Sequence, residues 1–168
     1  MFDKFGEFDS AAELNAVAKE LMKEADTNSI RVLAEENGID REDAEDYITG
    51  AATELATPLM AAMGKLKVEN ADLKIEGILK DWQDQIIDLC TENKVMCAAV
   101  RKKDKCLKDC MAALIKYSFE NKVQISDKIV DATKVTHNGK LEPMRKPLYL
   151  GIPNRTEAKR IIRDYYMK

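Results

Sequence analysis

Apolar residues recur along most of this chain at the three- and four-residue spacing of amphipathic helices. Ser10 and Glu13 form a capping-box pattern ahead of the first such segment, which predicts a helix over about residues 10–25. Gly38 stands where a second helix would need a left-handed residue at its end, and Asp40 is expected to cap a third. The segments predicted to be helical are 10–25, 27–37, 40–50, a stretch with Pro58 in or just before its first turn, 73–90, 92–102, 104–121, a short piece from Ser126, and a last helix from about Thr156.

The pattern changes between Thr133 and Asn154. Asn138-Gly139 is a strong signal for a hairpin turn, and Pro143, Pro147 and Pro153 interrupt any helix. The expected fold class is therefore all-α, a compact multi-helix bundle with one loop or small β-hairpin near the C-terminal end.

A weak boundary is expected around Gly50 to Thr57. It would divide an acidic three-helix N-terminal lobe, residues 1–50, from a larger helical lobe with a basic C-terminal part, residues 51–168. A single continuous domain is the alternative.

Composition places the chain among soluble globular proteins. Its 168 residues are 45% hydrophobic and 34% charged, and no apolar run approaches the roughly 20 residues of a membrane-spanning helix. Residues 1–8 have neither a basic n-region nor an apolar h-region, so no signal peptide is expected. These features predict a cytoplasmic protein.

Charge is segregated along the chain. Residues 1–100 hold 10 Lys/Arg against 22 Asp/Glu, whereas residues 101–168 hold 17 against 8. The net charge of -3 therefore hides two parts of opposite sign, which points to charged macromolecular partners.

The four cysteines are Cys90, Cys97, Cys106 and Cys110. The six, eight and three residues between them do not match paired zinc knuckles, and Cys106 and Cys110 fall on a helical apolar stripe. Reduced, buried core thiols are favoured over metal ligands, although the metal alternative stays open.

Little in the sequence suggests catalysis. His137 is the only histidine and directly precedes the Asn-Gly turn, where surface exposure is the simpler expectation. No glycine-rich phosphate loop or hydrolase motif occurs. We expect a non-enzymatic protein with no catalytic, cofactor-binding or metal-binding residues.

Residues 33–39 have the spacing of a helix-turn-helix corner, but the helix that follows is acidic and would be repelled by DNA phosphates. One interpretation is that acids in its first turn complement the helix dipole. The other is a partner-binding acidic patch that competes with nucleic acid, formed by Glu35, Glu36, Glu42, Asp43, Glu45 and Asp46.

The basic C-terminal part offers cations for nucleic acid or a protein partner: Arg101, Lys102, Lys103, Lys105, Lys108, Arg145, Lys146, Lys159, Arg160 and Arg163. Phosphate binding needs only spread cations, so loose spacing suffices. A solvated face with local pairs, such as Arg160 with Asp164, is the alternative. A winged-helix variant over residues 104–151 would add Lys128, Lys134 and Lys140 as DNA-facing cations.

Six strings of the chain carry a family resemblance: residues 2–10, residues 33–48, Asp81-Trp82, residues 98–103, residues 150–153 and residues 161–166. They resemble a family of small proteins carried on conjugative and other mobile elements of gut Firmicutes, the PcfK-like group. Some relatives in this group are described as anti-CRISPR inhibitors of Cas9, so the resemblance implies a role and a partner but no site residue.

The leading expectation is a protein that inhibits Cas9 by binding the nuclease or its complex with guide RNA. The acidic lobe could occupy a basic surface as a nucleic-acid mimic, or the basic half could contact DNA or RNA while the acidic half binds the protein. The alternatives are a DNA-binding accessory protein of conjugative or mobile-element transfer, and a homo-oligomeric structural protein.

Overall fold

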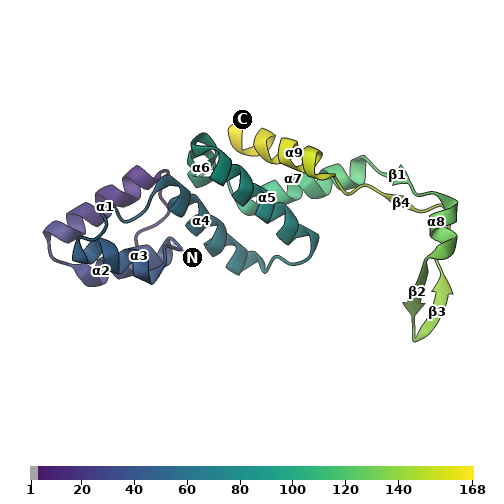
Figure 1. Ribbon diagram of the computed structural model, residues 1–168, viewed down its shortest axis with the longest axis horizontal. Helices are drawn as coiled ribbons and strands as arrows, with labels where there is room; N and C mark the ends of the chain where they lie inside the picture. The colour runs from purple at the N-terminus through teal and green to yellow at the C-terminus, as the bar shows by residue number, and fades with distance from the viewer. Residues whose placement is uncertain (1–3) are drawn as a thin grey trace.

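The computed structural model describes residues 4–168, which are predominantly helical (Figure 1). Residues 2 and 3 of the first string above lie outside this range. The helices are α1 (Ala11–Lys23), α2 (Thr27–Glu36), α3 (Arg41–Thr49), α4 (Pro58–Leu73), α5 (Ile78–Glu92), α6 (Lys94–Arg101), α7 (Leu107–Glu120), α8 (Asp127–Ala132) and α9 (Arg155–Met167). The mostly helical fold with a small hairpin near the C-terminal end is confirmed.

Two small antiparallel sheets complete the fold. The expected hairpin joins β2 (Lys134–His137) to β3 (Lys140–Pro143). Its two turn residues, Asn138 and Gly139, both have positive φ, as a two-residue type I′ turn requires. The second sheet pairs β1 (Val123–Gln124) with β4 (Tyr149–Leu150), and its long-range pairing has no sequence signal.

The end of α2 matches the sequence expectation closely. The amide of Gly38, at φ 67, donates to Glu35 O, and the amide of Ile39 donates to Ala34 O at 2.9 Å. These two bonds form a Schellman motif. Asp40 does occupy the cap position of α3, but its carboxylate pairs with Lys67 Nζ at 2.7 Å and makes no cap hydrogen bond.

Buried apolar residues form two clusters that meet within α4. The N-terminal cluster includes Leu14, Ile30 and Leu33 and ends at Ala61. The C-terminal cluster begins at Ala62 and contains the apolar faces of α5, α6, α7 and α9. Helix α4 contributes to both clusters, and the boundary expected around Gly50 to Thr57 stays a prediction.

The two clusters are joined by a close backbone crossing. A Cβ on Gly38 would overlap Gly64 O in α4, and a Cβ on Gly64 would overlap Asn37 O. Only glycine at both positions lets the α2–α3 turn reach the α4 backbone. The crossing therefore fixes the N-terminal helices against α4.

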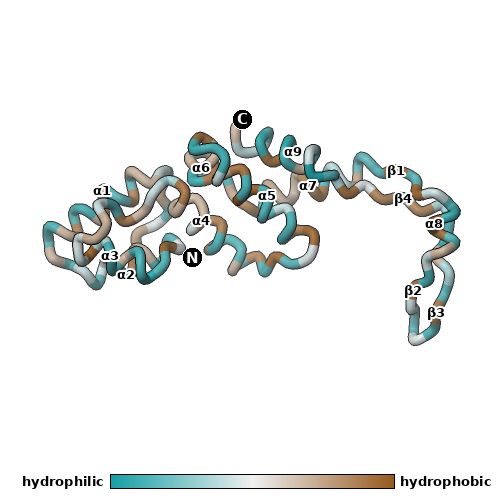
Figure 2. Tube along the Cα trace, viewed as in Figure 1, coloured by the Kyte–Doolittle hydropathy of each residue, from teal (hydrophilic) through white to brown (hydrophobic). Residues whose placement is uncertain are grey.

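Residues 122–152, here called the arm, extend away from the helical body (Figure 1). β1 and β4 form its neck, and α8 with the β2–β3 hairpin forms its tip. Hydrophobic stretches occur in the neck as well as in the body (Figure 2). In the described part of the chain, no helix is long and apolar enough to cross a membrane.

Candidate functional site

A buried ionic cluster lies between α4, the N-terminal segment and the loop after α6. Lys65, which is 1% exposed, pairs with Glu7 Oε1 at 2.6 Å and donates to the carbonyls of Lys102 at 2.5 Å and Lys105 at 2.6 Å. These three acceptors match the three N–H donors of its ammonium group. Lys65 therefore anchors the loop on which several of the predicted basic residues lie.

Glu69 extends this cluster one turn along α4. Its Oε2 accepts a hydrogen bond from the amide of Leu107 at 2.8 Å, and its Oε1 lies 3.9 Å from Lys65 Nζ. Burial raises the pKa of Glu69, while the bond from Leu107 and the charge of Lys65 oppose that increase. The carboxylate supplies an acceptor for the start of α7, whose cap residue makes no side-chain cap hydrogen bond.

Arg101 was predicted among the cations that bind nucleic acid or a partner, but it is buried and so is not available on the surface. Its side chain is 1% exposed and donates to Asn37 Oδ1 at 2.5 Å. Burial lowers the pKa of Arg101, and the nearby Glu7 and Glu69 oppose this effect. Arg101 contacts the α2–α3 turn because α6 packs along α4, which the sequence spacing did not reveal.

The other predicted cations lie in three separate regions. Lys102, Lys103 and Lys108 are exposed around the loop before α7, and Lys105 stacks over the Tyr165 ring at 5.2 Å. On α9, Lys159 pairs with Glu92 at 3.2 Å and Arg160 with Asp164 at 3.3 Å, which leaves Arg163 exposed beside them. Arg160 thus matches the local-pair alternative, whereas Lys159 pairs with a residue of α5 that lies 67 positions away in the sequence.

On the arm, Arg145 is exposed and Lys146 pairs with Asp131 at 2.5 Å. The pairing with Asp131 raises the pKa of Lys146. The three cations expected from the winged-helix interpretation, Lys128, Lys134 and Lys140, are all exposed. The arm is therefore the place where exposed cations gather away from the helical body.

The predicted acidic residues divide into a group with hydrogen-bond or ion-pair partners and, within residues 4–168, a group without them. Glu36 accepts hydrogen bonds from the amides of Lys4 and Phe5, and Glu45 pairs with Arg31 at 2.6 Å, which lowers the pKa of Glu45. Among the described residues, no hydrogen bond or ion pair engages the carboxylates of the other four, Glu35, Glu42, Asp43 and Asp46. These four form what we call the acidic face.

Helix stability does not account for the whole acidic face. Glu42 and Asp43 in the first turn of α3 complement the helix dipole, as one interpretation of the sequence holds. Asp46, however, lies four residues after Glu42, where like charges repel, and it approaches the negative end of the dipole. The position of Asp46 favours the partner-binding interpretation.

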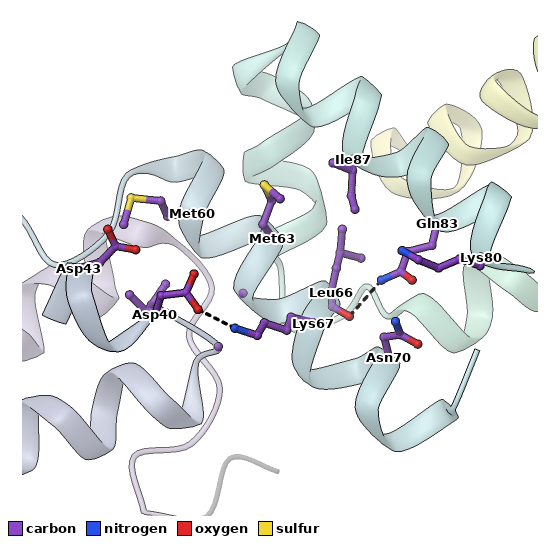
Figure 3. Close-up of a pocket in the computed structure, with 13 residues that line it drawn as sticks. Asp40, Asp43, Met60, Met63, Leu66, Lys67, Asn70, Lys80, Gln83 and Ile87 are labelled. Carbon is purple, nitrogen blue, oxygen red and sulfur yellow. Dashed lines mark hydrogen bonds and ion pairs between the residues drawn. The ribbon is translucent and has the colours of Figure 1, made fainter. Parts of the chain in front are cut away.

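Two hollows adjoin the acidic face, and each is lined by apolar side chains, carboxylates and cations, with Lys67 in the lining of both. The first, of about 350 Å³, lies between α3, α4 and α5 and includes Asp43, Met60 and Met63 (Figure 3). The second, of about 660 Å³, includes Glu35 at its rim and Ala44 and Val68 in its lining. In the first, Gln83 Nε2 donates to Leu66 O at 3.4 Å, whereas its buried Oε1 has no hydrogen-bond partner among the described residues.

The remaining candidates for chemistry are dispersed. Cys90, Cys97 and Cys110 are buried and Cys106 is partly buried, all as free thiols, and burial raises the pKa of Cys90 and of Cys110 to about 12. Within residues 4–168, no group of three or more His, Cys, Asp or Glu side chains is placed to hold a metal ion. His137 is exposed on β2.

Sequence reasoning missed the buried ionic cluster. Lys65 stands in the apolar stretch Ala61-Ala62-Met63-Gly64-Lys65-Leu66, with Glu69 four residues later. A charged pair embedded in such a stretch is a signal for buried ions, since unpaired charges are rarely tolerated there. Neither the family models, nor the curated proteins, nor the solved structures searched contain a match to this chain.

Proposed function

We propose that this chain is a binding protein that inhibits Cas9 by occupying the nuclease or its complex with nucleic acid. The observation that carries this proposal is the acidic face, four carboxylates without cationic partners among the described residues, on and beside the helix α3. Cas9 holds nucleic acid in a positively charged channel and recognises its PAM with arginines, so such a face presents charges that mimic phosphates. The resemblance to the PcfK-like group supports the same partner.

A cleavage assay tests this proposal. Cas9 loaded with guide RNA is mixed with a target plasmid and increasing amounts of the full chain, and inhibition is expected at molar excess. The double variant Glu42→Lys/Asp46→Lys is expected to lose most of that inhibition, whereas Asp72→Lys/Glu76→Lys, with the same charge change at exposed positions outside the acidic face, should retain it.

Two results would contradict the proposal. Uninhibited cleavage by Cas9 at a large excess of the wild-type chain would remove the inhibitor function. Equal loss of inhibition in both double variants would show that total charge matters and the acidic face does not. Retention of the chain by Cas9 should also weaken as salt rises, because exposed charges are screened.

The second candidate is a DNA-binding accessory protein of mobile-element transfer, favoured by one specific feature. The arm presents a helix followed by a hairpin, with Lys128, Lys134 and Lys140 exposed on it. In this case, Lys128→Glu/Lys134→Glu/Lys140→Glu should abolish retention of duplex DNA. Loss of DNA binding with undiminished inhibition of Cas9 would exclude the accessory function as the explanation of the inhibition.

A further inference from the structure

Helix α3, which carries three of the four residues of the acidic face, has little stability of its own. It has nine residues, fewer than the roughly 12–15 that an isolated helix needs in water. Its cap residue Asp40 makes no side-chain cap hydrogen bond, and its buried side chains are those of Ala44 and Tyr47. Contacts with the rest of the chain must therefore hold α3 in place.

The charges of α3 weaken it further. Its carboxylates fall within five consecutive positions, at Glu42, Asp43, Glu45 and Asp46, and Arg41 is the one basic residue of the helix. Like charges four residues apart, such as Glu42 and Asp46, destabilise a helix. A cation from another element that pairs with one of these carboxylates would relieve the repulsion.

Arg31 in α2 supplies that cation through a bidentate pair. Its Nε donates to Glu45 Oε1 at 2.6 Å, and its Nη2 donates to Glu45 Oε2 at 3.0 Å. Its Nη1 donates to Thr27 Oγ1 at 3.3 Å and to Asn28 Oδ1 at 3.2 Å, both in the first turn of α2. The guanidinium is thus held in one orientation by its own helix, and a planar fork of this kind fixes the direction of the carboxylate that it binds.

We propose that Arg31 is a positioning residue for the acidic face. Through Glu45, it holds α3 against α2 at one rotation about the helix axis, which keeps Glu42 and Asp46 exposed to a partner. Arg31 acts without contacting that partner. Its effect on Cas9 rests on the proposed function, whereas its hold on α3 is a property of the free chain.

Substitution of Arg31 separates positioning from charge, because the two roles predict opposite results. Arg31→Met removes a cation and leaves Glu45 as a further unpaired carboxylate, so charge alone would make the chain a stronger inhibitor. Positioning predicts a weaker one. We expect the concentration that half-inhibits Cas9 to rise about fivefold, which is the upper end for a pair that is partly exposed.

Hydrogen exchange in the free chain measures the hold on α3 directly. The Ala44 amide donates to Asp40 O at 3.1 Å at the start of the helix, and the Ala52 amide donates to Asp46 O at 2.9 Å just beyond its end. Exchange at both amides should be about fivefold faster in Arg31→Met. Arg31→Lys should also exchange faster, because an ammonium keeps the charge but cannot form the bidentate pair.

A double variant tests whether the pair can be replaced. Arg31→Met/Glu45→Met substitutes two apolar side chains for the ion pair and leaves all four carboxylates of the acidic face in place. It should restore slow exchange and most of the inhibition, since such replacements are often neutral. The matched control is Arg155→Met, which makes the same charge change and breaks the exposed pair with Asp88 on α5, and it should behave as the wild type.

Three results would overturn the proposal. The first is inhibition by Arg31→Met that equals or exceeds that of the wild type, and the second is unchanged exchange at Ala44 and Ala52 in that variant. The third is a loss of inhibition that the double variant does not reverse, which would show that Arg31 contacts the partner itself. A wild-type chain without effect on Cas9 would refute the proposed function alone, because exchange in the free chain still decides whether Arg31 holds α3.

Discussion

Lys65 is a buried charge whose contacts come from three separate parts of the chain. Its ammonium contacts the Glu7 carboxylate near the N-terminus and two carbonyls of the loop after α6, which lie 37 and 40 residues after Lys65 in the sequence. A buried ion is tolerated only when its partners are complete, and removal of one partner leaves the others uncompensated. The position of the loop after α6 therefore depends on the side chain of Lys65.

Replacement of Lys65 by Met should destabilise the fold strongly. The substitution leaves Glu7 and Glu69 without their cation and two carbonyls without a donor, so we expect a loss of about 3–5 kcal/mol in the free energy of unfolding. Urea denaturation measures it. Lys67→Met, which removes only the exposed pair with Asp40, should cost about 0–1 kcal/mol, and equal losses in both variants would contradict the role of the buried cluster.

Glu69 should make stability depend on pH. Its pKa is raised above 4.5, so above pH 4.5 the unfolded chain releases this proton while the folded chain retains it. The contribution of Glu69 to stability is therefore complete below pH 4.5 and is lost as the pH rises toward the raised pKa.

Glu69→Gln removes that titration, so the free energy of unfolding should fall less with rising pH than in the wild type. Urea denaturation at a series of pH values above 4.5 measures the difference. Glu76→Gln, at an exposed position before α5, should keep the wild-type slope. Parallel stability curves for the wild type and Glu69→Gln would refute this account.

Among the helices and strands, nearby residues predicted those features that short-range hydrogen bonds and backbone geometry determine, namely the starts of helices and the hairpin turn. Ser10 accepts a hydrogen bond from the Glu13 amide at the start of α1, Pro58 opens α4, and Asn138-Gly139 makes the turn of the hairpin. The neck was not predictable in this way, because β1 and β4 are two residues long and pair across the whole tip of the arm. Its attachment depends on Gly151, where a Cβ would overlap Ser118 O in α7.

Gly151→Ala should loosen the arm without unfolding the body. The added methyl forces β4 away from the end of α7, so the local opening free energy of the neck should fall by about 1–3 kcal/mol. Hydrogen exchange at the Ile125 amide, which donates to Leu148 O at 2.8 Å, reports this opening. Gly139→Ala strains only the hairpin turn, so faster exchange at Ile125 in that variant as well would argue against a specific role for Gly151.

At the scale of the molecule, the helical body and the arm differ in what holds them together. The body contains both apolar clusters, and neither includes a residue of the arm. Replacement of residues 125–148 by a short glycine-serine linker should therefore leave the thermal unfolding midpoint of the body within a few degrees of the wild type. Calorimetry measures the midpoint, and a large fall would show that the arm supports the body.

Residues near one another in the chain specify most of the helices, the hairpin turn and the division of charge, although the predicted helix 73–90 is wrong at its start, because α4 ends at Leu73 and α5 begins at Ile78. Which charges remain available at the surface depends on long-range packing. Packing buries Arg101 and Lys65, and it pairs Glu45 with Arg31 and Lys146 with Asp131. The side chains that stay exposed include Glu35, Glu42 and Asp46 of the acidic face and Lys128, Lys134, Lys140 and Arg145 of the arm. A charged side chain is no longer free to bind a partner when packing buries it or pairs it with a residue from a distant segment. The spacing of apolar residues along the chain does not predict which segments come into contact.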